Sequence, residues 1–242
     1  MPQAPPDPEA ARREAIADAK RLMRLARTAS LATLAPETGA PLATLVGIAS
    51  DFDGAPLFLM STLSRHTRHV QTDPRVSVLL TQPPGRGDPL NHPRLTLNGR
   101  LLPAAAPNAR SRYLRRNPKA ALYAGFADFG MFRLEIEGVH FNGGFGRAAP
   151  LAPADILAPR DGEAALTEAE PGLLAEINAS GPAHVARLAG PAAAGRRLWR
   201  AVGLDAEGLD LAAGKGVARL QFSAPACDPA GWRARLIEAA NG

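Results

Sequence analysis

The chain has 242 residues, a formal net charge of +5, and 46% hydrophobic but only 5% aromatic residues. This length allows one large domain, or a medium domain with a small appendage, and the apolar fraction suffices for a sizeable core. The single cysteine, Cys227, excludes an internal disulfide framework, a four-cysteine zinc site and a cysteine-ligated iron–sulfur cluster. No run approaches the roughly 18 apolar residues of a membrane span, so we expect a cytoplasmic protein with no membrane partner.

The charge is distributed unevenly along the chain. Residues 1–150 hold 19 basic and 12 acidic side chains, whereas residues 151–242 hold 9 and 11. A nucleic-acid-binding protein usually adds a cluster of Lys and Arg interleaved with aromatic residues on one face. The arginines here are scattered rather than clustered. We therefore expect no nucleic acid as a partner.

The N-terminal part predicts one helix followed by three strands. Residues 8–28 carry an apolar stripe at helical spacing, formed by Ile16, Ala19, Leu22, Met23 and Ala26. Arginines, among them Arg24, lie outside this stripe, and Asp7-Pro8 is typical of a helix cap and first turn. The next apolar segments are expected strands separated by turns, at residues 29–35, 41–50 and 56–60.

Three further strands complete the first half of the chain. A short basic helix at 64–72 precedes apolar segments that we expect to be strands, at residues 75–81, 94–104 and 131–141. Gly99 is expected to mark a bulge or a close approach of two backbones, and residues 107–124 predict helical pieces broken near Asn117-Pro118. Neither nucleotide-binding glycine motif occurs. Six strands joined mostly by hairpins predict an α+β fold, a six-stranded antiparallel split β-barrel with flanking helices.

A glycine- and proline-rich segment at 143–159 predicts a domain boundary. Beyond it the pattern predicts helices at 167–178 and 182–188, two or three short strands around Gly208 and residues 214–216, and a last helix at 231–240. We expect a barrel domain over residues 8–150 and a small α/β C-terminal domain over residues 160–242.

The turn between the third strand and the basic helix gathers hydroxyl and cationic side chains. The residues concerned are Ser61, Thr62, Ser64, Arg65, His66 and Arg68. Free N–H groups at a helix start, hydroxyl donors and guanidinium groups together favour a phosphate. This turn therefore predicts a site for a phosphorylated small molecule. His66 and His69 have a spacing that can hold a metal, but the sequence offers no third ligand near them, so we predict no metal site.

The sequence resembles the FMN-binding split-barrel proteins related to pyridoxamine 5′-phosphate oxidase. The segments that carry the resemblance are PLATLVGIASDFDGAPLFLMSTLSRHTRHVQTDPRVSVLL, PRLTLNGRL and YLRRNPKAALYAGFADFGMFRLEIEGVHFNGGFG. The GGFG ending and the C-terminal appendage resemble a branch linked to haem utilisation, whose small domain carries an M-N-x-D-H motif. At that place this chain reads INASGPAH, which keeps Asn178 and His184.

The resemblance implies a homodimer with FMN across its interface. The residues that it places at the cofactor are Ala43, Thr44, Leu45, Val46, Met60, Ser61, Arg65, His66 and Arg94, and the phosphate argument adds Ser64. Ala43 stands where the oxidase has a basic residue, and Ile48 stands near the position of its substrate-binding lysine. Pyridoxamine phosphate is therefore not the expected substrate.

Three functions stay open on the sequence alone. The first is an FMN-dependent oxidoreductase, in which the flavin performs the redox step and the protein anchors its phosphate. The second is a haem-binding or haem-degrading protein on the same barrel. The third is a flavin-binding module without turnover. No Ser/His/Asp triad or pair of carboxylates suggests another chemistry.

Overall fold

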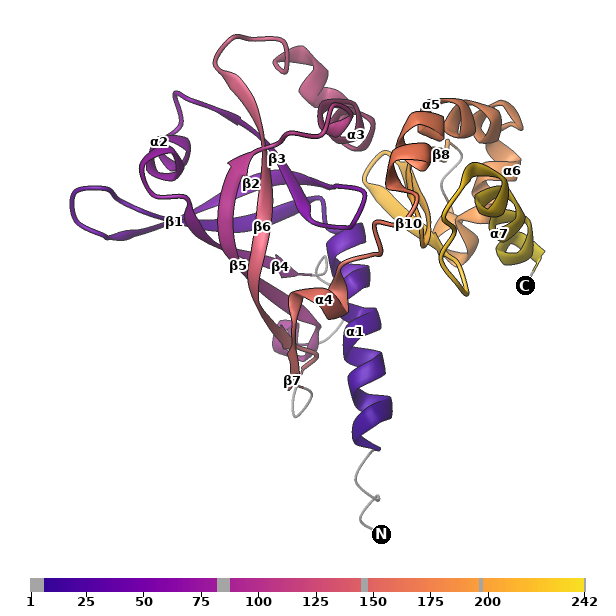
Figure 1. Cartoon of the computed structure of the whole chain (residues 1–242), viewed down its shortest axis with the longest axis horizontal. Helices are drawn as coiled ribbons and strands as arrows, with labels where there is room; N and C mark the ends of the chain where they lie inside the picture. The colour runs from indigo at the N-terminus through magenta and orange to yellow at the C-terminus, as the bar shows by residue number, and fades with distance from the viewer. Residues whose placement is uncertain (1–6, 82–87, 145–147, 196–197, 242) are drawn as a thin grey trace.

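The computed structural model describes residues 7–81, 88–144, 148–195 and 198–241. Its larger sheet contains β1 (Thr28–Leu34), β2 (Pro41–Ser50), β3 (Pro56–Ser61), β4 (Arg75–Thr81), β5 (Arg94–Pro103), β6 (Phe129–Asn142) and β7 (Ala148–Leu151). The strands follow the order β3-β2-β1-β4-β5-β6-β7, and an additional β3–β6 pairing closes six of them into a barrel. All of these pairings are antiparallel. The predicted six-stranded antiparallel barrel is confirmed (Figure 1).

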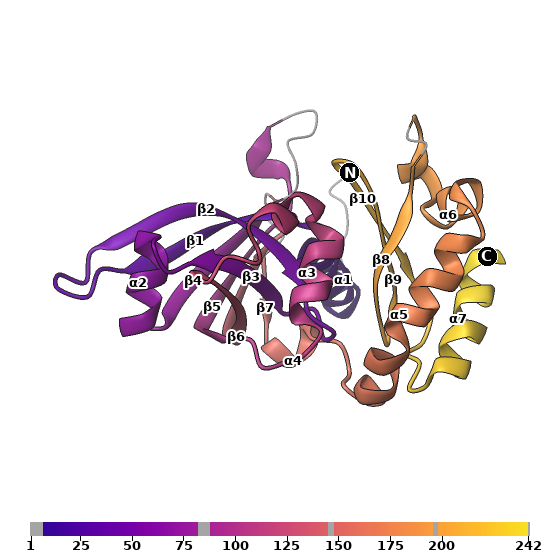
Figure 2. The same cartoon turned by 90° about the horizontal axis from the view of Figure 1, so that it is seen from above.

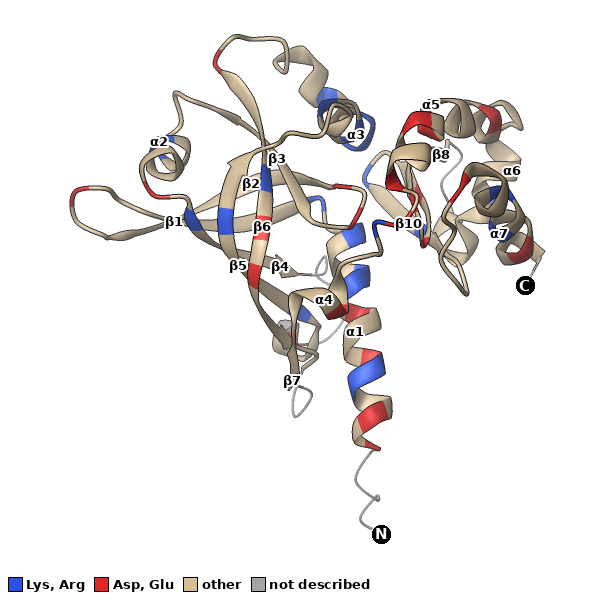
Figure 3. Ribbon diagram, in the orientation of Figure 1, with Lys and Arg blue, Asp and Glu red and all other residues tan. Residues whose placement is uncertain are grey.

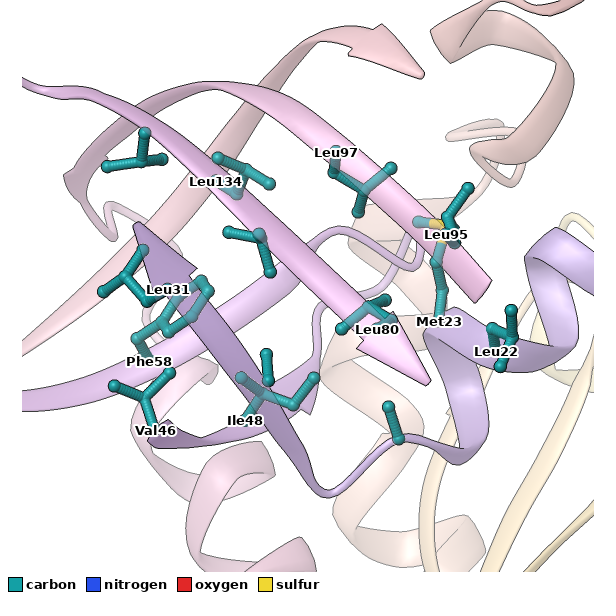
Figure 4. Packing of buried hydrophobic residues seen from close by; sticks show 14 of the residues in the cluster. Leu22, Met23, Leu31, Val46, Ile48, Phe58, Leu80, Leu95, Leu97 and Leu134 are labelled. Atoms are coloured by element: carbon teal, nitrogen blue, oxygen red, sulfur yellow. The ribbon is translucent and has the colours of Figure 1, made fainter. Parts of the chain in front are cut away.

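The barrel interior is filled by the inward side chains of its strands. β4 and β5 alternate buried and more exposed residues, as expected for strands with one face in a core. Leu31, Ile48, Phe58 and Leu97 are among the side chains that meet there (Figure 4). Burial of about 25 cal/mol per Å² of apolar surface is the main force that holds such a closed sheet together.

Helix α1 (Pro8–Leu25) adds its apolar stripe to this core. It begins as predicted, since the carboxylate of Asp7 accepts a hydrogen bond from the Glu9 N–H at 3.1 Å. Leu22 and Met23 pack against the barrel residues (Figure 4). The helix ends three residues earlier than expected, because Thr28 already pairs with Gly47 in the sheet.

Four helices and turns lie outside the barrel within the first half of the chain. They are α2 (Arg65–Thr72), η1 (Pro89–Asn91), α3 (Ala109–Arg116) and η2 (Pro118–Leu122). α3 and η2 meet at Asn117-Pro118, as predicted. A small apolar cluster that includes Leu57, Leu59 and Tyr113 packs α3 against the barrel wall.

Helix α4 (Pro153–Ile156) packs against α1 and β6, and Ile156 belongs to the barrel core. After it the chain forms a three-stranded sheet with helices on one face. The elements are α5 (Glu163–Ala179), α6 (Pro182–Leu188), η3 (Gly190–Ala193), β8 (Arg200–Asp205), β9 (Gly208–Ala213), β10 (Gly216–Gln221) and α7 (Pro229–Asn241). Figure 2 shows α5 and α7 on the outer side of this sheet, while α1 and α3 lie between the sheet and the barrel. Trp199 and Trp232 are fully buried in its core. We call residues 160–242 the C-terminal unit; its boundaries as a domain stay a prediction.

One expectation about α1 is wrong. The helical pattern placed Arg24 outside the apolar stripe, yet Arg24 is only 4% exposed. Its guanidinium donates to the carbonyl oxygens of Asp51 and Phe52 and lies 3.1 Å from the carboxylate of Asp205. The C-terminal unit covers this face of α1, and a sequence pattern within one helix cannot reveal a distant segment that packs against it.

No helix within the described ranges is both long and apolar enough to cross a bilayer.

Candidate ligand-binding cleft

A cleft of about 850 Å³ opens where β2 and β3 meet η2 and the C-terminal unit. Its volume lies within the range of roughly 300–1,000 Å³ that is typical of small-molecule sites. The residues that line it are Arg27, Thr28, Leu45, Val46, Gly47, Leu59, Met60, Ser61, Ser64, His66, Tyr113, Asn117, Pro118, Lys119, Ala120, Tyr123, Phe129, Gly214 and Lys215. The walls therefore combine apolar, aromatic and cationic side chains, and none of these lining residues is acidic.

Most of the site residues expected from the sequence come together in this cleft. Those that line it are Leu45, Val46, Met60, Ser61, Ser64 and His66. Thr44 lies behind the wall, where its hydroxyl meets the His66 ring. The cluster arises because β2 and β3 are neighbours in the sheet and α2 starts just after β3.

The remaining expected residues lie outside the cleft. Ala43 and Arg65 are exposed and do not line it. Arg94 pairs with Asn142 at one end of β6, whereas Ser61 pairs with Phe129 at the other end of this 14-residue strand. Thirteen residue steps correspond to roughly 40 Å of strand. Within one chain, Arg94 and the cleft therefore do not meet, and the assignment of all ten residues to FMN stays a prediction.

The hydroxyl of Ser61 is already engaged within the chain. It donates to the carboxylate of Asp128 at 2.5 Å and accepts a hydrogen bond from the Leu63 N–H at 3.1 Å. The sequence argument for a phosphate did not foresee Asp128, which lies 67 positions further along the chain. A carboxylate beside this turn repels a phosphate, and the exposed Arg65 does not reach into the cleft to offset it.

His66 presents a half-buried imidazole to the cleft. Its Nδ1 lies 3.4 Å from the Thr44 hydroxyl, which in turn lies 3.5 Å from the Leu31 carbonyl oxygen. Because a carbonyl can only accept, we assign the hydroxyl hydrogen to Leu31 and the Nδ1 hydrogen to Thr44. This tautomer leaves the lone pair on Nε2. Burial, helped by the nearby His69, lowers the pKa of His66 below its ordinary value of 6.5.

His69 has a separate structural role. Its ring is buried and its Nδ1 lies 3.1 Å from the hydroxyl of Thr33 on β1, whereas His66 contacts β2. The two imidazoles are thus each held by a different strand. Although the two histidines are three residues apart on one helix, each forms its own hydrogen bond with a different threonine.

Sequence reasoning missed the aromatic wall of the cleft. Tyr113, Tyr123 and Phe129 line it, and the rings of Tyr123 and Phe129 lie 5.0 Å apart. Burial raises the pKa of the Tyr113 hydroxyl well above its ordinary value, so this group remains a hydrogen-bond donor at neutral pH. The chain contains only two tyrosines, and both lie here. The small number of tyrosines was the only feature of the sequence that could have drawn attention to this wall.

The family model described as CREG, β-barrel matches residues 10–157, which is more than half of the chain. The chain belongs to the CREG β-barrel family. The match covers the barrel strands, α1 and the short helix α4. The finer relation to pyridoxamine 5′-phosphate oxidase stays a prediction.

Similar proteins include two that are named for haem. The non-canonical haem oxygenase HOZ from chloroplasts of Arabidopsis thaliana is 32% identical over 113 residues, which is 46% of this chain and 34% of that protein. The chain thus spans about a third of the length of this curated relative. A haem-binding protein from Mycobacterium smegmatis is 25% identical with a TM-score of 0.55, and the match covers 99% of this chain and 98% of that one.

A solved structure from Agrobacterium tumefaciens, Atu2129, matches almost the entire chain. It is 37% identical with a TM-score of 0.82, covering 97% of this chain and 100% of that one, and its function is described as unknown. The match therefore includes the C-terminal unit.

Proposed function

We propose that this CREG-family protein binds haem in the cleft, with His66 as the ligand of the iron. The observation that carries the proposal is the His66 imidazole at the cleft wall, neutral at neutral pH and held through Nδ1. A histidine that ligates a metal commonly donates its other ring N–H to a fixed acceptor, and Thr44 is that acceptor here. The names of the relatives from Arabidopsis thaliana and Mycobacterium smegmatis support the same ligand.

The other residues of the cleft fit a haem molecule. A planar macrocycle needs apolar and aromatic walls, which Val46, Met60 and Phe129 provide. Its two propionates need cations, and Arg27, Lys119 and Lys215 line the cleft without an acidic neighbour among the lining residues. The volume of about 850 Å³ is large enough for a ligand of this class.

Bound haem would supply an iron centre whose chemistry the axial ligand and the polarity of the pocket tune. The residues of the chain would hold and orient this ligand. Thr44 fixes the His66 ring and its tautomer. The buried Tyr113 hydroxyl keeps its proton and can donate a hydrogen bond to a group held in the cleft. The apolar walls exclude water from the face of the ligand.

The same geometry favours haem over FMN as the first candidate. A phosphate of charge near −2 would lie beside Asp128, which already binds Ser61. Arg65, the expected guanidinium partner of that phosphate, is exposed outside the cleft. The carboxylates of a haem would instead meet the lining cations Arg27, Lys119 and Lys215, and its iron would accept the imidazole lone pair that His66 offers.

We further propose that a second copy of the chain covers the mouth of the cleft. Large apolar side chains are exposed around it, with Leu45 and Leu63 each 75%, Leu122 81% and Phe126 60% exposed. Contiguous exposed apolar residues mark interaction surfaces in stable proteins. A homodimer would remove them from water and enclose the ligand.

The direct test is a titration of the purified chain with haemin, followed by absorbance. We expect a shifted Soret band with 1:1 saturation. In His66→Ala the Kd rises by roughly tenfold or more, because loss of even the partner of a ligating histidine costs about 10- to 100-fold in affinity. His184→Ala is the control, since His184 lies on α6, does not line the cleft and contacts Arg187. A chain that purifies with a two-band flavin spectrum and leaves the haemin spectrum unchanged would contradict the proposal. Loss of the Soret band on adding a reductant in air would extend it to haem degradation.

A further inference from the structure

The turn between β9 and β10 brings the C-terminal unit into the wall of the cleft. Gly214 and Lys215 of this turn line the cleft together with residues of the barrel and η2. Gly214 has a φ of +56°, the left-handed conformation that glycine adopts without strain. The CREG family match ends at residue 157, so these two residues lie outside it.

Arg27 attaches this turn to the barrel. Its guanidinium donates to the carbonyl oxygen of Gly214, and both residues line the cleft. Arg27 directly precedes β1. The contact therefore joins the edge of the barrel to the tip of the hairpin, and Lys215 follows immediately in the chain.

Buried ion pairs fix the hairpin behind the turn. Arg219 of β10 lies 2.8 Å from Asp205 and 2.9 Å from Asp210, and Arg24 of α1 lies 3.1 Å from Asp205. Burial alone would raise the pKa of Asp205, but the two guanidinium groups outweigh it and hold the pKa at about 2. Figure 3 shows charged residues gathered where α1 and α3 face the C-terminal unit. The position of Lys215 is thus set by a network that spans the two parts of the chain.

The cations of the cleft come from three separate segments. Arg27 precedes β1, Lys119 lies in η2 and Lys215 lies in the β9–β10 turn. Within the described part of the chain, no Asp or Glu lines the cleft to neutralise these three positive charges. Arg27 donates one of its N–H groups to the Gly214 carbonyl oxygen, whereas the side chains of Lys119 and Lys215 are exposed. A ligand carboxylate at the β9–β10 turn would be attracted by Arg27 and Lys215, which meet there through Gly214, and Lys119 adds a third positive charge to the same cleft.

We propose that Lys215 is a specificity-determining residue that pairs with a carboxylate of the bound tetrapyrrole, so that the C-terminal unit completes the binding site. This inference rests on the proposed haem site and adds to it a role for the appended sheet. It predicts that the protein binds a porphyrin with free carboxylates more tightly than the corresponding diester. It also predicts that this difference in affinity becomes smaller when the positive charge of Lys215 is removed.

The test uses iron-free protoporphyrin IX and its dimethyl ester, with fluorescence as the readout. For Lys215→Glu we expect the Kd of the dicarboxylate to rise by about five- to tenfold at low salt, and that of the diester to stay unchanged. Lys215→Gln gives an intermediate increase. Arg235→Glu changes the net charge by the same amount on α7, outside the residues that line the cleft, and leaves both affinities unchanged. Thermal unfolding of each variant checks the fold.

The outcomes separate this inference from the proposed function. If the dicarboxylate and haemin bind equally well to the wild type and Lys215→Glu, the role of Lys215 is wrong and the haem site stands. An equal loss for the dicarboxylate and the diester also contradicts pairing with a carboxylate. If the wild type binds neither haemin nor protoporphyrin IX, the haem site fails, and the inference fails with it.

Discussion

The His66 imidazole has to lose its proton before its Nε2 can bind iron, and its burial makes that easy at neutral pH. Because the pKa of His66 is lowered from 6.5, the neutral form dominates above that value. We expect the haemin affinity of the wild type to be constant through neutral pH and to fall only at a pH below 6.5, where protons compete for the lone pair. The measurement is the Kd for haemin between about pH 5 and 8. His66→Ala should lack this transition; a fall that begins above 6.5 would mean that the pKa is raised.

Gly47 makes room for the Tyr113 hydroxyl in the floor of the cleft. A Cβ at position 47 would lie 2.8 Å from Tyr113 Oη, which is closer than real Cβ contacts, whereas the next nearest atom, Tyr113 Cζ, would lie 4.0 Å away. We expect Gly47→Ala to lower the free energy of unfolding by about 1–3 kcal/mol and to weaken haemin binding. In a Tyr113→Phe background the same change should cost much less. Urea unfolding of the four proteins measures this coupling, and equal costs in both backgrounds would contradict it.

Local features were predictable where the partner is near in sequence, as at Asp7, or where the residue type itself indicates a backbone irregularity, as at Gly99. Asp7 caps α1, and at Gly99 the register of β5 and β6 shifts while a Cβ would lie 1.9 Å from the Glu135 carbonyl oxygen. Arg24 and Asp128 were not predictable in this way. Their partners lie far along the chain, so only the folded structure brings them together.

At the scale of elements, α3 and α5 are joined by a buried carboxylate. Glu170 of α5 lies 2.5 Å from Arg112 and 2.6 Å from Arg115, and Arg112 and Glu170 are almost fully buried. Removing this carboxylate leaves two guanidinium groups without their counter-charge. We expect Glu170→Ala to lower the free energy of unfolding by about 3–5 kcal/mol.

Glu168 provides the matched control for that prediction. It lies two residues away on α5 and is exposed, so Glu168→Ala should change the stability by no more than about 0.5 kcal/mol. Denaturant unfolding measures both variants. Similar small effects for the two changes would show that Glu170 does not join α3 to α5.

The strands of the barrel were predictable because apolar segments alternate with clear turns. The predicted strands at 41–50 and 75–81 match β2 and β4 residue for residue. β7 and α4 were missed, since they lie in a segment rich in glycine and proline that favours a loop. β7 forms because β6 is long enough to offer an edge at residues 139–142, and this is a tertiary effect.

At the scale of the whole molecule, the proposed homodimer depends on the apolar residues around the cleft. We expect Phe126→Glu combined with Leu122→Glu to convert a dimer into a monomer, because the charges would be buried without partners. Ile237→Glu is the control; Ile237 is 63% exposed on α7, on the outer side of the C-terminal unit. Light scattering after size-exclusion chromatography gives the mass. A monomeric wild type, or dissociation by Ile237→Glu, would contradict the proposed surface.

The fold of the barrel followed from the sequence, but the cleft did so only in part. The lining residues between Leu45 and His66 come from β2, β3 and the start of α2, which follow one another in the chain, so their contribution to the cleft could be predicted. Tyr113, Lys119 and Lys215 enter the cleft from elements whose positions depend on the packing of α3 and the C-terminal sheet. The charge of the cleft is therefore a property of the assembled molecule.

The most direct test of the account is the position of iron in a crystal grown with haemin. We predict an anomalous iron signal in the cleft, within bonding distance of His66 Nε2, with the propionates directed toward Arg27 and Lys215. An iron site elsewhere, or electron density for a flavin in the cleft, would contradict the account.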